Sequence, residues 1–164
     1  MRRVLTSWSV IILSAVAFLA IGYSFSIYAP QTGEPILDMI ASRADVLARL
    51  DAMDADQKAA HFQMTLLPDT LYPIAYALLL AGLAMRAFPE AGWWLAIPAF
   101  AAGGIDIIEN IVQLMALQGS VGLVGLKAVL TPAKFILFVC SALMVLVCWL
   151  LVGTKALRRR MKGT

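Results

Sequence analysis

Long runs of apolar residues alternate with short polar segments along this chain, and four of the runs are long enough to cross a bilayer. They cover residues 4–29, 65–88, 93–117 and 131–152, and a spanning helix needs about 20 apolar residues. The pattern predicts an all-α integral membrane protein whose four spans form a four-helix bundle. Its 164 residues suit a single membrane domain over 1–164.

The polar segment between the first two spans, residues 30–63, has a different pattern. Apolar residues recur in it at helical spacing, and Asp54 followed by Gln57 matches a capping box. We therefore expect two short amphipathic helices in this loop, with apolar faces against the mouth of the bundle or the lipid interface. The recurring apolar residues are Ile36, Ile40, Leu47 and Leu50.

Composition supports a membrane location. Hydrophobic residues make up 62% of the chain and charged residues only 14%, whereas a soluble domain is about half apolar and a quarter charged.

The first run begins like a signal peptide, but it is longer than the apolar core of a signal peptide. Ile27 and Pro30 also make a poor cleavage site around Ala29. We expect this run to be a retained anchor.

Lysine and arginine predict the orientation of the spans. The positive-inside rule places the more basic segments in the cytoplasm, and the tail at 155–164 dominates the count. This bias predicts that both termini are cytoplasmic, that the 30–63 loop faces outward, and that the protein lies in a plasma membrane, most simply a bacterial inner membrane. The segments assigned to the inside carry Arg2, Arg3, Arg86, Lys155, Arg158, Arg159, Arg160 and Lys162, and those assigned to the outside carry Arg43, Arg49, Lys58 and Lys127.

The third run contains polar residues that a spanning helix does not normally carry. Asp106, Glu109, Asn110 and Gln113 are spaced i, i+3, i+4 and i+7, which puts them on one helix face. Charged groups inside a bilayer are costly and turn toward partners within the protein. The face therefore predicts polar partners on neighbouring spans.

The second and fourth runs carry matching polar stripes. Counting 1.5 Å per residue from the span ends places the groups of all three spans in the outer half of the bilayer, with Asp69 near enough to the surface to stay solvated. We expect Lys134 to pair with Glu109 or Asp106, which leaves three acids to one base. The stripe on the second run is Asp69, Tyr72, Pro73 and Tyr76, and that on the fourth is Thr131, Lys134, Ser141 and Cys148.

An unbalanced buried cluster holds a proton, admits water or binds a cation. The leading hypothesis is therefore an outward-facing pocket for a lipid headgroup, a small amphiphile or a cation, with membrane lipids as neighbours. The expected binding residues are Asp69, Tyr72, Tyr76, Asp106, Glu109, Asn110, Gln113 and Lys134.

Other interpretations of the same residues stay open. The charges can simply fix helix packing in a scaffold, an accessory subunit or a homo-oligomer. Asp69, Asp106 and Glu109 are also candidate catalytic carboxylates for an embedded hydrolase or transferase, because two close carboxylates can act as acid and base. The same three acids, with or without His61, are candidates for an oxygen-rich metal site.

Several chemistries are excluded by what the sequence lacks. One histidine rules out bis-histidine haem and a three-histidine zinc site, and Cys140 and Cys148 on one helix cannot form a disulfide. No phosphate-binding loop, cofactor motif or nucleic-acid-binding stripe occurs. In length and span count the chain resembles bacterial lipoprotein signal peptidase, but Ile107 follows Asp106 where that family has Asp-Arg, and no residue is carried over.

Overall fold

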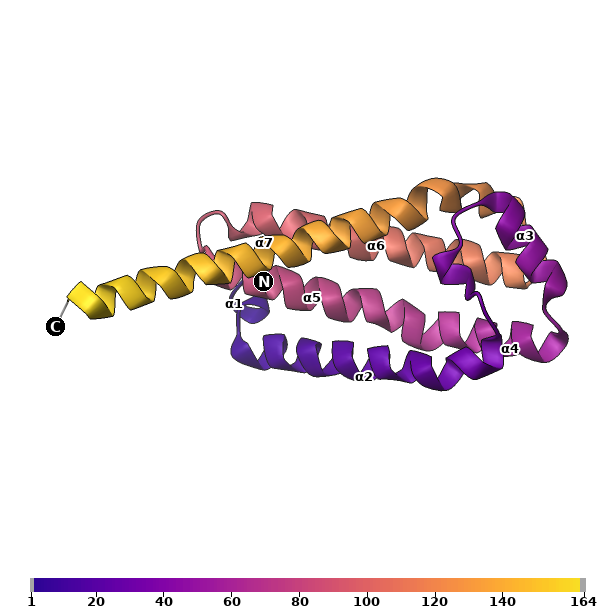
Figure 1. The fold of residues 1–164 in the computed structure, drawn as a ribbon, viewed down its shortest axis with the longest axis horizontal. Helices are drawn as coiled ribbons and strands as arrows, with labels where there is room; N and C mark the ends of the chain where they lie inside the picture. The colour runs from indigo at the N-terminus through magenta and orange to yellow at the C-terminus, as the bar shows by residue number, and fades with distance from the viewer. Residues whose placement is uncertain (1, 163–164) are drawn as a thin grey trace.

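The computed structural model describes residues 2–162, and these residues contain helices and connecting segments but no strand (Figure 1). Four of the helices are long and apolar enough to cross a membrane, which confirms the all-helical, four-span prediction at that level. In chain order the elements are α1 (Arg2–Leu5), α2 (Trp8–Thr32), η1 (Leu37–Met39), α3 (Arg43–Ala52), α4 (Ala55–Met64), η2 (Thr65–Asp69), α5 (Thr70–Ala87), α6 (Gly92–Leu117), η3 (Val124–Leu126) and α7 (Lys127–Lys162).

The ends of the spans differ from the predicted limits for local reasons. The first span begins at Trp8, because the Ser7 hydroxyl accepts the N–H of Val10 and caps a new helix after α1. The fourth span is longer than expected, since α7 continues to Lys162 through most of the basic tail. The capping box of Asp54 and Gln57 is present at the start of α4, but α4 does not end as a separate helix.

Instead, α4 runs into α5 through the π-helical turn η2, and two prolines shape this junction. Pro68 has no N–H group and so interrupts the α-helical pattern of backbone hydrogen bonds. Within the wider π-helical turn, the hydroxyl of Thr70 donates a hydrogen bond to the carbonyl of Thr65 at 2.8 Å. Pro73, four residues beyond Asp69, likewise leaves the Asp69 carbonyl without an α-helical donor. That carbonyl becomes available to another helix.

The long helices pack as neighbours in the order α2, α5, α6, α7. The interface of α5 with α6 is the most extensive and is lined by small buried residues, among them Ala81 and Ala99. Small residues allow spanning helices to approach closely. α7 packs on α6 and α5, and α2 packs on α5 and α4, whereas α2 and α7 make almost no contact with each other. Both of these outer helices expose large apolar side chains along their length.

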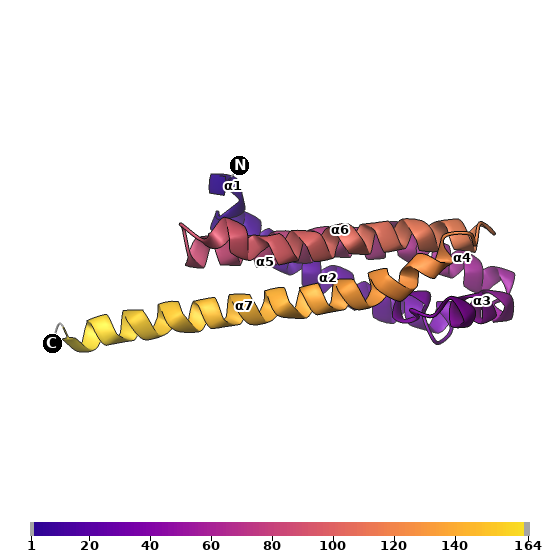
Figure 2. The ribbon, with the colours of Figure 1, turned by 90° about the horizontal axis from the view of Figure 1, so that it is seen from above.

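The molecule has two distinct ends (Figures 1 and 2). Both termini lie at one, which we call the terminal end, and α3, α4 and the α6–α7 connection lie at the other, which we call the loop end. At the loop end, Leu37 of η1 and Val46 and Leu50 of α3 are buried against Ala116 and Val124. This apolar cluster holds the returning loop over the end of α6, and so brings η1 close to the polar residues of the spans.

Candidate functional site

The four polar residues of α6 all face the protein interior. Asp106, Glu109, Asn110 and Gln113 are each at least nine-tenths buried, as their helical spacing predicts. The amide of Asn110 donates to the Asp69 carbonyl at 2.8 Å, the acceptor that Pro73 leaves free. Asp106 and Glu109 bind basic residues of α7. The stripe on α6 therefore joins α5, η2 and α7 through direct hydrogen bonds and ion pairs.

One set of these residues forms a buried network, which we call the inner network: Thr65, Glu109, Gln113, Lys127 and Thr131. The ammonium group of Lys127 forms an ion pair with Glu109 Oε1 and donates to Gln113 Oε1 at 3.1 Å. Thr131 donates to the same Glu109 oxygen at 2.6 Å, and the Gln113 amide donates to the Thr65 hydroxyl at 2.9 Å. All five side chains are buried, so the network ties η2, α6 and α7 together away from solvent.

The structure corrects the predicted position of Lys127, which the sequence analysis placed in an outer segment. It is only 1% exposed, because α7 begins one turn earlier than the predicted span and carries this residue between the helices. A signal for it exists in the sequence: Lys127, Thr131 and Lys134 are spaced i, i+4 and i+7, the period of one helix face. The expected ratio of three acids to one base is therefore wrong.

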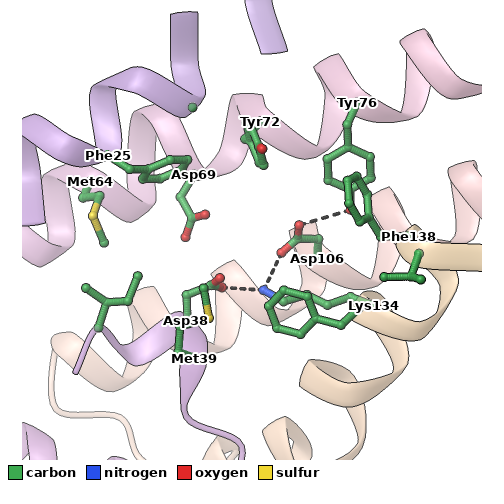
Figure 3. Close-up of a pocket in the computed structure, with 14 residues that line it drawn as sticks. Phe25, Asp38, Met39, Met64, Asp69, Tyr72, Tyr76, Asp106, Lys134 and Phe138 are labelled. Carbon is green, nitrogen blue, oxygen red and sulfur yellow. Dashed lines mark hydrogen bonds and ion pairs between the residues drawn. The ribbon is translucent and has the colours of Figure 1, made fainter. Parts of the chain in front are cut away.

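A second set, the cavity cluster, consists of Asp38, Asp69, Asp106, Lys134 and Tyr76 (Figure 3). Lys134 makes ion pairs with Asp38, with Asp106 at 2.8 Å and with Glu109 of the inner network at 3.0 Å. Tyr76 donates its hydroxyl to the other oxygen of Asp106 at 3.1 Å. The expected contacts of Lys134 with α6 are thus present.

Asp38 is the member of the cluster that the sequence analysis missed. It lies in η1, in the loop between the first two spans, and reaches Lys134 because Leu37 and its neighbours anchor that loop over the bundle. No pattern in the sequence indicates this contact, since it depends on how the loop returns. With Asp38, four buried or partly buried carboxyl groups surround two ammonium groups.

The Oδ2 atom of Asp69 is buried and has no hydrogen-bond partner among residues 2–162, and within this range the carboxyl group forms no ion pair. It is 5% exposed, rather than solvated as expected from its position near the end of the span. Figure 3 shows its side chain directed toward Asp38 and Asp106. A buried charge without a partner is costly, so this group is the unsatisfied element of the cluster.

The cavity cluster lies at the bottom of a cavity of about 420 Å³ between α2, α5, α7 and η1. Its walls are mostly apolar and include Phe25 of α2, Met39 of η1 and Phe138 of α7. Tyr72 stacks on Phe18 at 4.9 Å and meets Phe25 edge-on at 5.4 Å between ring centroids, which forms an aromatic wall. Residues of both α2 and α7 line the cavity, although these two helices make few contacts with each other.

Gly22 of α2 contributes to the shape of this cavity. A Cβ atom at this position would lie 3.6 Å from the ring of Tyr72, an ordinary van der Waals distance, so the ring packs closely against the backbone of α2. Tyr76 in turn packs edge-on against Phe138 of α7, with the ring centroids 4.9 Å apart. The two tyrosines therefore link the wall of the cavity to its polar floor.

The metal candidates are arranged differently from the sequence hypothesis. Asp38, Asp106 and Glu109 have carboxylate oxygens within 4.8 Å of one another, while His61 lies outside this group. His61 is fully buried and its Nε2 accepts the N–H of Leu37 at 3.1 Å. The ammonium group of Lys134 contacts all three carboxylates and so supplies the positive charge that a metal ion would bring.

Comparison with protein-family models, with curated proteins and with solved structures finds no match for this chain. The geometry of the site therefore carries the functional argument alone.

Proposed function

We propose that this protein binds, within the membrane, an amphiphile with a positively charged or strongly hydrogen-bond-donating head. The polar head would lie against Asp69 on the floor of the cavity, and the apolar part would lie between α2 and α7. The protein would be a multi-pass plasma-membrane protein with its loop end outward, so that the amphiphile comes from the outer leaflet.

The shape and chemistry of the cavity support an amphiphile rather than a free ion. Small-molecule sites are typically about 300–1,000 Å³ and mostly apolar, with a few polar groups that orient the ligand. The 420 Å³ cavity fits this description, with aromatic walls above an acidic floor. Its position between two helices that expose apolar side chains gives an acyl or alkyl chain a route from the bilayer.

The observation that carries the proposal is the unpartnered carboxyl group of Asp69. Lys134 is already shared by Asp38, Asp106 and Glu109 and makes no ion pair with Asp69. A ligand that brings its own cation or N–H donors would satisfy Asp69 and reduce the excess of acids in the cavity cluster. A ligand with neither a cation nor a strong hydrogen-bond donor would leave this cost in place.

The proposal is tested with dodecylamine and dodecanol, which share a chain and differ in the head. Native mass spectrometry from a nonionic detergent should show dodecylamine retained by the wild-type protein and dodecanol retained much less. Asp69→Asn should lower dodecylamine occupancy about tenfold, as expected for loss of a hydrogen bond to a charged group. The same substitution should leave dodecanol retention unchanged.

Asp45→Asn is the matched control, because Asp45 is an exposed acid of α3 outside the cavity. It removes the same charge and should leave amine binding intact. Equal retention of the amine and the alcohol by the wild-type protein, or equal losses of amine in both variants, would reject the proposed role of Asp69.

The inner network supports a second, structural function. Its two charges are paired, buried and linked by hydrogen bonds to η2, α6 and α7, an arrangement that fixes helix register. We propose this role for the inner network alongside ligand binding in the cavity. An acid–base role for Asp69 with Asp106 is a weaker proposal, because Lys134 and Tyr76 already hold Asp106.

A further inference from the structure

A second cavity lies at the terminal end, away from the cavity cluster, and has the opposite chemistry. It measures about 480 Å³ and lies where α1 and the start of α2 meet the end of α5 and the middle of α7. Arg2, Trp8, Arg86 and Trp149 line it, and no acidic residue does. It therefore presents positive charge and aromatic surface without a compensating carboxylate.

Arg86 is held in place but keeps free donors. One guanidinium nitrogen donates to the carbonyl of Thr6 at 2.7 Å, and the guanidinium carbon lies 4.2 Å from the centre of the Trp8 ring. These contacts fix the plane of the group. Among residues 2–162, the guanidinium groups of Arg86 and Arg2 form no ion pair. Both can bind an anion without displacing a carboxylate.

Trp149 adds an N–H donor that has no acceptor. Its indole nitrogen is buried and has no hydrogen-bond partner among residues 2–162, although a buried indole N–H usually finds one. Its ring lies 6.2 Å from that of Trp8, on the same side of the protein as Arg86. Two guanidinium groups without a carboxylate partner and one N–H without an acceptor match a ligand with several anionic oxygens.

The position of the cavity indicates the source of that ligand. It lies at one end of four helices that are long and apolar enough to span a membrane, and tryptophan side chains favour the level of lipid headgroups. Basic pockets between spans at this level bind lipid headgroups. We propose that the terminal-end cavity binds the phosphate group of an anionic lipid in the adjacent leaflet. This proposal does not depend on the function of the Asp69 cavity.

The test uses dioleoyl phosphatidylglycerol, with dioleoyl phosphatidylcholine as the zwitterionic comparator, whose ammonium group offsets the phosphate charge. Native mass spectrometry should show the wild-type protein retaining phosphatidylglycerol in preference to phosphatidylcholine. Arg86→Gln and Trp149→Phe should each reduce phosphatidylglycerol retention, Arg86→Gln by about fivefold, the factor expected for one basic residue at a membrane surface. Trp149→Phe keeps the aromatic ring and so tests the N–H with little disturbance of the fold.

Arg158→Gln is the matched control, because it removes one positive charge at the terminal end of the molecule from a residue that does not line the cavity. It should retain phosphatidylglycerol like the wild-type protein. Equal losses in Arg86→Gln and Arg158→Gln would show that only total charge matters and would overturn the site. A large excess of glycerol 3-phosphate should not displace the lipid; displacement would assign the cavity to a soluble phosphate instead.

Discussion

Glu109 is the residue on which the inner network depends. It is fully buried, yet it forms ion pairs with Lys127 and Lys134 and accepts a hydrogen bond from Thr131. Residues on successive turns of α7 therefore compensate its charge. Burying a charge is tolerable only when partners are placed this well. Removing one partner should therefore cost more than the pair itself contributes.

We predict that Lys127→Met lowers the free energy of unfolding by about 3 kcal/mol, because it leaves the charge of Glu109 less compensated inside the protein. Glu109→Gln in the same chain should recover part of this loss. Reversible denaturant titration in mixed micelles, applied to both single variants and the double variant, measures the coupling. Strict additivity of the two single effects would show that the two side chains do not interact energetically.

The sequence predicted some residues of the site and not others, for physical reasons. The face of Asp106, Glu109, Asn110 and Gln113 is a helical period and is readable without tertiary structure. Lys127 lay outside the predicted span because the span was limited by its apolar run. The contact of Asp38 with Lys134 depends on the path of the loop between the first two spans, which local sequence patterns do not encode.

At the scale of elements, the two adjacent glycines of α6 have different roles. A Cβ atom on Gly103 would lie 3.1 Å from both the Ala77 side chain and the Pro73 carbonyl of α5, whereas one on Gly104 would meet nothing within 4 Å. Gly103 therefore sets the distance between α5 and α6, and with it the reach of Asn110 to Asp69.

We predict that Gly103→Val lowers the free energy of unfolding by about 1–3 kcal/mol, because the side chain must push α5 and α6 apart. Gly104→Val is the matched control and should be neutral or slightly stabilising, since valine favours a helix more than glycine does. The same micelle titration compares the two. A similar loss in both variants would contradict the assignment of Gly103 to the helix interface.

The π-helical turn shows why the boundaries of the second span were difficult to predict. The capping box at Asp54 marked a helix start correctly, and Pro68 favours a break. The structure avoids the break through the wider turn, which keeps α4 and α5 continuous. The prolines thus alter hydrogen bonding within the helix instead of ending it, and the carbonyl freed at Asp69 binds Asn110.

At the scale of the whole molecule, the distribution of basic residues predicts the orientation. Arg86, Arg158 and the other basic residues of the predicted inner segments belong to the terminal end, while the buried positive charges of Lys127 and Lys134 are neutralised near the loop end. Because Lys127 is buried, the loop end carries one exposed basic residue fewer than the sequence analysis counted, and the excess of basic residues at the terminal end is larger.

We predict that the loop end faces outward. In a chain without Cys140 and Cys148, Ser42→Cys should react with a membrane-impermeant maleimide in intact bacterial cells. Arg158→Cys should react only after the cells are permeabilised. Labelling quantified on gels measures both, and the reverse pattern of reactivity would place the termini outside.

The placement of the cavity between the apolar helices α2 and α7, the route proposed for the amphiphile, has a consequence for competition among ligands. A molecule that enters through the bilayer competes at its concentration in the membrane, which for a hydrophobic solute far exceeds its concentration in water. Modest intrinsic affinity is then enough for saturation. Which compound fills the protein in a living cell would follow from the abundance of the candidates in that leaflet as much as from the strength with which each is held.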